Sequence, residues 1–133
     1  MPHPNAELIT RAYDAFGRGD IVSVLGILSD DIRWRVPGQS PLSGDYNGHG
    51  EVLNFFTKSA GLSGGTLRID VHDILADDSK VFVLCTVSAT RAGKSVGFLE
   101  VHVWMMANGR AVEFREFQGD ALAEDKFWAG TEA

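Results

Sequence analysis

The hydrophobic and polar positions of the chain follow two different periods. In the first half, apolar residues recur every three or four positions, a spacing that places them on one stripe of a helix. It predicts helices over residues 5–17, 20–28 and 50–61, and apolar–polar alternation predicts one strand over residues 32–36. From residue 66 onward the period is two throughout, which is typical of half-buried strands.

The strongest local signal is a hairpin in the second half. Two runs rich in β-branched and aromatic residues, 95–106 and 111–118, flank the pair Asn108-Gly109. Asn and Gly both tolerate the positive φ angles that a type I′ turn requires. Two further strands are predicted over residues 66–75 and 80–91.

Three N-terminal helices followed by strands indicate an α+β fold, with the helices packed on one face of a curved, mostly antiparallel sheet. We expect a short tail helix over residues 121–128 to dock back on these layers. They would enclose a cone-shaped space, and such concavities bind small molecules. The glycine-rich segment 38–50 is expected to be an ordered loop, long enough to favour a functional role. Residues 1–133 are expected to form a single domain.

Composition and charge limit the classes of partner that this protein can bind. A net charge of −6 and a pI near 5.1 are unfavourable for nucleic-acid binding, which needs clustered Lys and Arg. The one cysteine, Cys85, has no partner for an internal disulfide and is interpreted as a small buried hydrophobe. No apolar run approaches the ~20 residues of a membrane span, and the N-terminus lacks the features of a signal peptide. We therefore expect a cytoplasmic protein with neither a nucleic-acid nor a membrane partner.

Several short motifs, taken in order, carry a family resemblance. They are Tyr13-Asp14-Ala15-Phe16-Gly17-Arg18-Gly19-Asp20, Leu28-Ser29-Asp30-Asp31-Ile32-Arg33-Trp34, Pro37-Gly38 and Asn108-Gly109-Arg110-Ala111-Val112-Glu113-Phe114-Arg115-Glu116-Phe117. The chain resembles the SnoaL-like proteins of the nuclear transport factor 2-like (NTF2-like) superfamily, which also contains ketosteroid isomerases and limonene epoxide hydrolases. The resemblance implies the cone-shaped fold, a hydrophobic pocket and a homodimer. It implies no single reaction, because isomerases, polyketide cyclases, hydrolases and non-catalytic binding domains share the fold.

The catalytic residues of these relatives have few counterparts here. The slot of the steroid isomerases' general-base Asp holds Val36, and the slot of their oxyanion-hole acid falls near Val101. Their oxyanion tyrosine falls near Ala12, one position before Tyr13, and one position rotates a helix by ~100°. The resemblance to the hydrolases and cyclases leaves one acid, Asp120. We interpret Asp120 as the candidate acid–base group, with the N-cap of the tail helix as the alternative.

Two more side chains are candidate catalytic donors. Tyr13 either hydrogen-bonds a ligand or is a core tyrosine with a solvated hydroxyl. His49, in the loop before the third helix, is expected near the pocket mouth. The substrate-binding walls are expected from Trp34, Val36, Phe56, Val101, Val103 and Glu116, with a pair to Arg115 as the alternative for Glu116.

The parity of the strand over residues 95–106 decides which side chains face the cone. If Val101 faces inward, His102 faces outward, toward solvent or a partner subunit, and Trp104 lies on the same outer face. That face would mediate the homodimer. The four histidines lack the spacing of metal ligands, so we expect neither a metal nor a cofactor.

Two functions remain open from the sequence. The first is a SnoaL-like isomerase, cyclase or hydrolase that acts on a hydrophobic carbonyl compound by acid–base chemistry. The second is a non-catalytic ligand-binding or dimerisation module of the same fold, which the apolar residues Val36, Val87 and Val101 favour.

Overall fold

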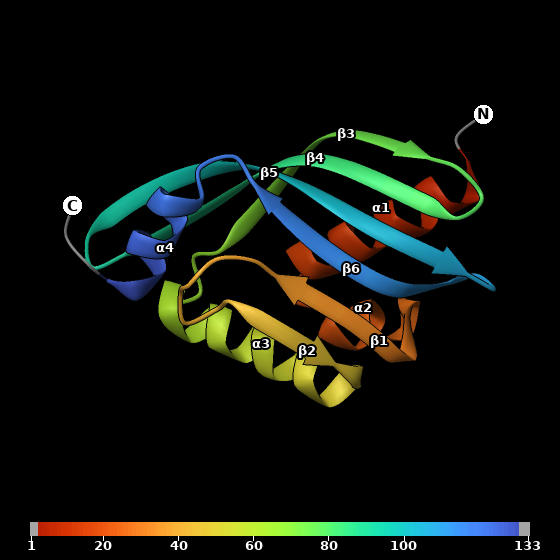
Figure 1. Cartoon of the computed structure of the whole chain (residues 1–133), viewed down its shortest axis with the longest axis horizontal. Coiled ribbons are helices and arrows are strands. Elements are labelled where there is room, and N and C mark those ends of the chain that lie inside the picture. Colours follow the sequence, from red (N-terminus) through yellow and green to blue (C-terminus); the bar gives the residue numbers. More distant parts are fainter. Residues whose placement is uncertain (1–2, 131–133) are drawn as a thin grey trace.

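The computed structural model describes residues 3–130 and shows four helices and one six-stranded sheet (Figure 1). The elements are α1 (Pro4–Gly17), α2 (Ile21–Ile27), β1 (Leu28–Val36), β2 (Gly44–Asn47), α3 (Gly48–Ser63), β3 (Arg68–Ala76), β4 (Lys80–Arg91), β5 (Lys94–Ala107), β6 (Arg110–Gln118) and α4 (Ala121–Ala129). The strand order is β2-β1-β6-β5-β4-β3. Only β1 and β6 are parallel, so the sheet is mostly antiparallel, as predicted.

The predicted hairpin is confirmed. Asn108 and Gly109 have φ angles of 53° and 74°, which are the two positive values that a type I′ turn needs. The turn and a register shift between Met105 and Met106 together place Trp104 opposite Phe114 and His102 opposite Glu116 on the paired strands β5 and β6.

Some boundaries differ from the prediction. His3, rather than Asn5, is the N-cap of α1, and its side chain accepts a hydrogen bond from the Asn5 backbone N–H. Asp20 caps α2 as expected, but the helix ends at Ile27, because Leu28 is already extended and begins β1. The predicted loop 38–50 contains the short strand β2, which pairs with β1.

The helices cover one side of the bent sheet. Figure 1 shows α1, α2 and α3 on the inner side of the bend, with α4 at the end of the molecule near the C-terminus. The three predicted N-terminal helices and the predicted tail helix are therefore all present. Within the described residues, no helix is both long and apolar enough to cross a membrane.

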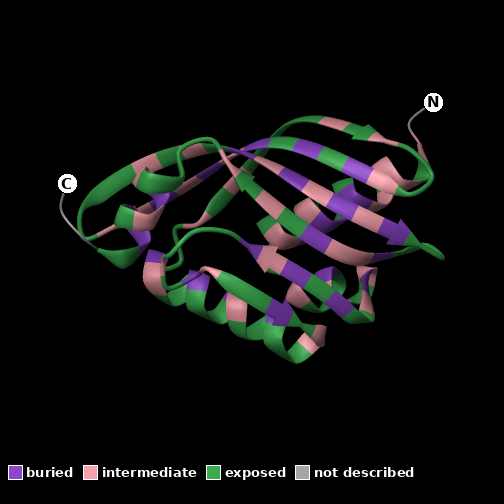
Figure 2. Cartoon of the chain, viewed as in Figure 1, coloured by how far each residue is buried: buried purple, intermediate pink, exposed green. Residues whose placement is uncertain are grey.

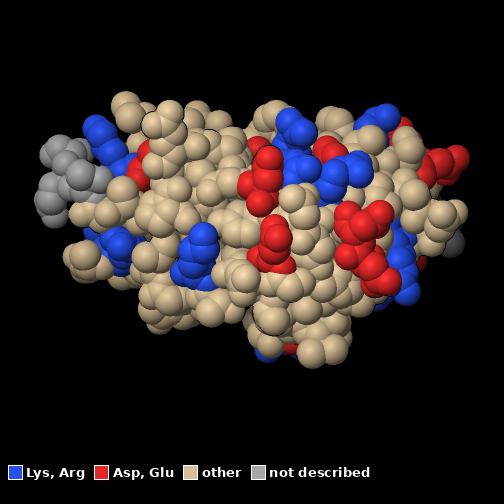
Figure 3. All heavy atoms as spheres, turned by 60° about the horizontal axis from the view of Figure 1, so that its bottom comes forward, with Lys and Arg blue, Asp and Glu red and all other residues tan. Residues whose placement is uncertain are grey.

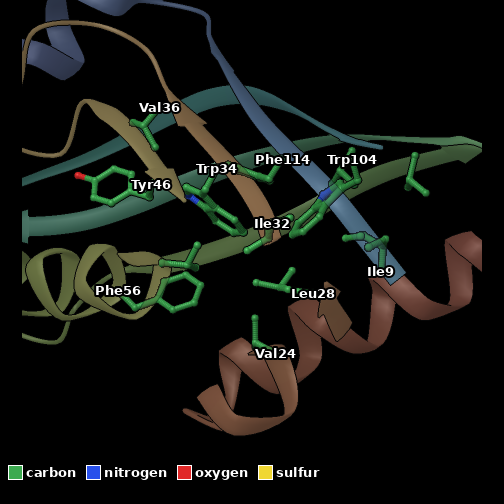
Figure 4. Close-up of a cluster of buried hydrophobic side chains, with 14 of the residues drawn as sticks. Ile9, Val24, Leu28, Ile32, Trp34, Val36, Tyr46, Phe56, Trp104 and Phe114 are labelled. Atoms are coloured by element: carbon green, nitrogen blue, oxygen red, sulfur yellow. The ribbon is translucent and has the colours of Figure 1, made fainter. Parts of the chain in front are cut away.

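Buried residues alternate with exposed ones along the strands, so the core lies on the inner face of the sheet (Figure 2). At its centre, Trp34 of β1 stacks on Phe114 of β6 with ring centroids 3.8 Å apart, and Trp104 of β5 meets both rings edge-on (Figure 4). Tightly packed aromatic rings contribute stability beyond their buried area.

The outer face of the sheet carries an apolar stripe across three strands. Leu84, Val101 and Phe117 lie directly opposite one another on β4, β5 and β6, and Phe117 is 51% exposed. The face that carries α2, α3 and β1 instead shows acidic and basic side chains interspersed (Figure 3).

Candidate functional site

A cavity of about 80 Å³ lies between the helices and the inner face of the sheet. Its wall is mainly aromatic and aliphatic, and most of its ionisable groups come from β5, β6, α1 and α4. The lining residues on which the argument depends are Tyr13, Phe16, Trp34, Val36, Phe55, Phe56, Leu67, Glu100, His102, Trp104, Phe114, Glu116, Gln118, Glu124 and Trp128.

The polar end of the cavity is built by strand register. Glu100 and His102 of β5 lie directly opposite Gln118 and Glu116 of β6, so all four side chains share the inner face. The outward orientation considered for His102 is therefore wrong, since His102 is buried and lines the cavity. The physical reason is that residues of even number on β5 point inward, in register with the core residue Trp104.

A chain of hydrogen bonds joins α1 to β5 at this end. The Tyr13 hydroxyl lies 2.6 Å from Nδ1 of His102, and Nε2 of His102 lies 2.8 Å from Oε1 of Glu100. The indole N–H of Trp104 donates to the same Tyr13 hydroxyl at 3.1 Å. A neutral imidazole has one donor and one acceptor nitrogen, so a proton on one side of the ring determines the direction of both bonds.

Burial changes the acidity of these groups. It lowers the pKa of His102 to about 4, so the imidazole is neutral at pH 7. Burial, together with the nearby Glu116, raises the pKa of Glu100 to about 8. It also raises the pKa of Tyr13 above its usual value, so the phenol keeps its hydrogen.

Glu124 of α4 adds a second buried acid. Its side chain is 1% exposed, and burial, with a hydrogen bond to Glu100, raises its pKa to about 11. Each carboxyl group therefore keeps its own proton at pH 7, so Glu100 and Glu124 form a protonated pair. The thiol of the neighbouring Cys85 stays protonated and is therefore a poor nucleophile, because burial raises its pKa to about 12.

One group of side chains has the spacing of a cation site. Ligand atoms of Glu100, His102 and Glu116 lie within 4.8 Å of one another. Spacing along the sequence could not reveal this group, because its members come from two strands. The Glu100 and His102 atoms already bond each other, and Glu116 accepts a hydrogen bond from Gln118 at 2.8 Å. We therefore assign the cluster to proton sharing.

The structure brings together five of the residues singled out from the sequence. Tyr13, Trp34, Val36, Phe56 and Glu116 all line the cavity.

Two expected wall residues lie elsewhere. Val101 and Val103 are opposite Phe117 and Arg115 on the outer face, so they are not part of the lining. Their odd numbering on β5 places them on the side away from the core.

Two expected catalytic residues also lie outside the cavity lining. Asp120 is exposed and caps α4, where its carboxylate accepts a hydrogen bond from the Ala123 N–H at 3.1 Å. The cap interpretation is therefore right and the pocket-acid interpretation is wrong. His49 donates through Nε2 to the Leu28 carbonyl at 3.0 Å and fixes the start of α3 against β1.

Glu100, Gln118 and Glu124 were not predicted as site residues from the sequence. The sequence did contain a signal for Glu100. It shares the strand parity of Trp104, and because a large aromatic side chain normally faces the core, Glu100 should face inward too. Glu124 could not be found this way, because the position of α4 depends on tertiary contacts.

Solved structures of similar shape share this architecture. Bal32a, from a soil-derived mobile gene cassette, is 31% identical with a TM-score of 0.90, covering 94% of this chain and 96% of that one. An NTF2-like protein from Burkholderia pseudomallei is 29% identical with a TM-score of 0.87, covering 96% and 98%. TerC, co-crystallised with polyporic acid, is 26% identical with a TM-score of 0.85, covering 94% and 98%.

An open curved sheet, helices on its inner side and an aromatic cavity between them define an NTF2-like protein. Within that class the chain belongs to the SnoaL-like domain family, whose sequence model matches residues 9–114. The uncharacterized protein Rv0034 of Mycobacterium tuberculosis is 31% identical over 124 residues, which are 92% of this chain and 95% of that protein. The resemblance and the α+β fold class expected from the sequence are thus confirmed.

Proposed function

We propose that the protein is an acid–base enzyme that acts on a hydrophobic ring compound with a carbonyl group. The observation that carries the proposal is the hydrogen-bonded chain Tyr13–His102–Glu100 at the end of an aromatic cavity. Acid–base catalysis needs donors and acceptors within hydrogen-bond reach of the reacting atoms in a site that excludes water. This end of the cavity supplies both.

The protonation state of Glu100 sets the donor and acceptor roles in the hydrogen-bonded chain Tyr13–His102–Glu100. With Glu100 protonated, its hydrogen is donated to Nε2 of His102, and the Nδ1 hydrogen is donated to the Tyr13 oxygen. That oxygen also accepts from Trp104, so the Tyr13 hydrogen is free to bond a carbonyl oxygen in the cavity. Negative charge that develops on the carbonyl oxygen during enolisation is then stabilised by a fixed donor.

Glu116 is the acceptor for the substrate proton. It lines the cavity, is half-buried, and is held by the Gln118 amide. Its carboxylate would take a proton from the carbon next to the carbonyl group while Tyr13 bonds the enolate oxygen. Return of that proton to the same or a conjugated carbon completes an exchange or an isomerisation.

The size of the cavity limits the substrate. A dry cavity of about 150 Å³ holds benzene, so 80 Å³ requires side chains at the edge to turn before a ring enters. Phe16, Phe55 and Leu67 are half-buried and line the cavity, which makes them the movable residues. Co-crystallisation of the similar TerC with polyporic acid supports a small organic ligand for this fold.

Deuterium exchange tests the proposal directly. Acetophenone in D2O is incubated with the protein, and loss of its methyl proton signal is followed by NMR. We expect exchange faster than in buffer, reduced about 100–1,000-fold by Tyr13→Phe, the effect of losing one oxyanion donor or proton-transfer group. Tyr46→Phe is the control, because that hydroxyl donates to the Leu42 carbonyl instead. Exchange no faster than in buffer would overturn the proposal.

A non-catalytic ligand-binding module is the second candidate. It is favoured by the protonated pair Glu100–Glu124, which provides no base, and by Val36 in the steroid isomerases' base slot. Ring compounds that bind tightly without any proton exchange would support this candidate over the enzyme.

A further inference from the structure

We infer that the ligand carries a hydrogen-bond acceptor and a separate neutral hydrogen-bond donor, as a hydroxyl-substituted aryl ketone does. This inference rests on the proposed function and narrows its substrate class. It is carried by polar atoms that the folded chain buries without a partner.

Three buried side-chain polar atoms lack a hydrogen-bond partner among the described residues: Trp34 Nε1, Gln118 Oε1 and Glu124 Oε2. All three residues line the same cavity. Folded proteins rarely leave such atoms unpaired, so each needs an explanation. Glu124 is protonated at pH 7, so its carboxyl group can either donate or accept and sets no requirement on the ligand. One donor and one acceptor remain for a ligand.

Trp34 provides the donor. An indole N–H can only donate, so its partner must be an acceptor such as a carbonyl oxygen. The ring is held in place by stacking on Phe114 and by edge contacts with Trp104 and Phe56 at 5.6 and 5.5 Å. Figure 4 shows its nitrogen on the side toward Tyr46 and away from Trp104. Because Trp34 lines the cavity, its N–H is a second donor for a ligand acceptor, separate from the Tyr13 hydroxyl.

Gln118 provides the acceptor. Its Nε2 donates to Oε2 of Glu116 at 2.8 Å, which fixes the amide orientation and leaves Oε1 to accept. The carboxylate of Glu116, which the same amide holds, lies at this end of the cavity and disfavours a ligand anion. A neutral hydroxyl group fits there, whereas a carboxylate does not.

Four probes with one aromatic ring separate these contacts. Toluene has no polar group, acetophenone adds the carbonyl, phenol adds the hydroxyl, and 3-hydroxyacetophenone has both. Calorimetry at pH 7 should rank 3-hydroxyacetophenone tightest and toluene weakest, with about tenfold in affinity for each polar group, the usual net effect of one hydrogen bond. Benzoate should bind more weakly than acetophenone.

Variants then assign each contact to its residue. Trp34→Phe should reduce the advantage of acetophenone over toluene and keep that of phenol, and Gln118→Met should do the reverse. Trp128→Phe, the same change in the same cavity at a residue without an unpaired buried atom, should keep every ratio. If Trp34→Phe does not fold, the wild-type ranking and Gln118→Met still decide.

Each outcome separates the inference from the proposed function. Equal affinities across the wild-type series, ratios unchanged in both variants, or preferential binding of benzoate would overturn the inference. Binding in the expected order without proton exchange of acetophenone would support the inference and contradict the enzyme. Exchange without any polar preference would leave the enzyme and contradict the inference.

Discussion

Replacing Glu124 with Gln should stabilise the protein at neutral pH, although the change is made at a fully buried position. The unfolded chain ionises this carboxyl near its usual pKa of 4.5, whereas the folded chain holds the proton up to about pH 11. The folded state therefore binds the extra proton above pH 4.5, and stability that is complete below this pH is lost as the pH rises.

The magnitude follows from the gap between the two pKa values. Each pH unit above 4.5 costs about 1.4 kcal/mol of folding free energy, so the cost at pH 7 is about 3 kcal/mol. Gln has nearly the same shape and never ionises, and its amide can still donate to Glu100. Glu124→Gln should recover most of this energy at pH 7 and almost none at pH 4.5.

Urea unfolding at pH 4.5, 6 and 7.5 measures the effect. We expect the free energy of unfolding of the variant to exceed that of the wild type by a margin that grows with pH. Glu7→Gln, an exposed position on α1, is the control for simple loss of negative charge. A margin that is constant across the three pH values, or one that shrinks as the pH rises, would refute the assignment of a protonated buried acid.

Three further results are expected. Phe114→Ala should lower the free energy of unfolding by about 3–5 kcal/mol in urea titrations, because it removes the ring stacked on Trp34; a loss below 1 kcal/mol would contradict its central place. Asp120→Ala should cost about 1 kcal/mol as a lost N-cap and leave acetophenone exchange unchanged, measured by unfolding and NMR; abolished exchange in a folded variant would restore the pocket-acid interpretation. Sedimentation should show a homodimer that Phe117→Glu converts to a monomer, since the outer stripe is apolar; a monomeric wild type would rule this out.

Local patterns were sufficient to predict most of the fold. Asn108-Gly109 identified the hairpin because its backbone conformation is a property of those two residues alone. Strand β4 was bounded correctly by its alternation. The short strand β2 was missed because four residues between glycines carry too little periodicity, and its pairing partner β1 is what makes it a strand.

The site was harder to predict than the fold. Tyr13 and Trp34 were identified, but the parity of β5 was taken from a supposed match at Val101, and this error put His102 on the wrong face. Trp104 indicated the correct parity, because a large aromatic side chain normally faces the core and His102 lies on the same side of the strand. Asp120 was misjudged for a different reason: its cap geometry satisfies its carboxylate locally, and family position alone could not show that.

The family assignment ends at Phe114, yet three of the cavity's polar side chains, Glu116, Gln118 and Glu124, follow it in the sequence. Two proteins can therefore share the conserved pattern and still differ in the chemistry of this end. A survey of relatives that aligned only the matched segment would leave these three side chains out. Sorting them by the last strand and the terminal helix would separate them by the polar side chains of the cavity instead.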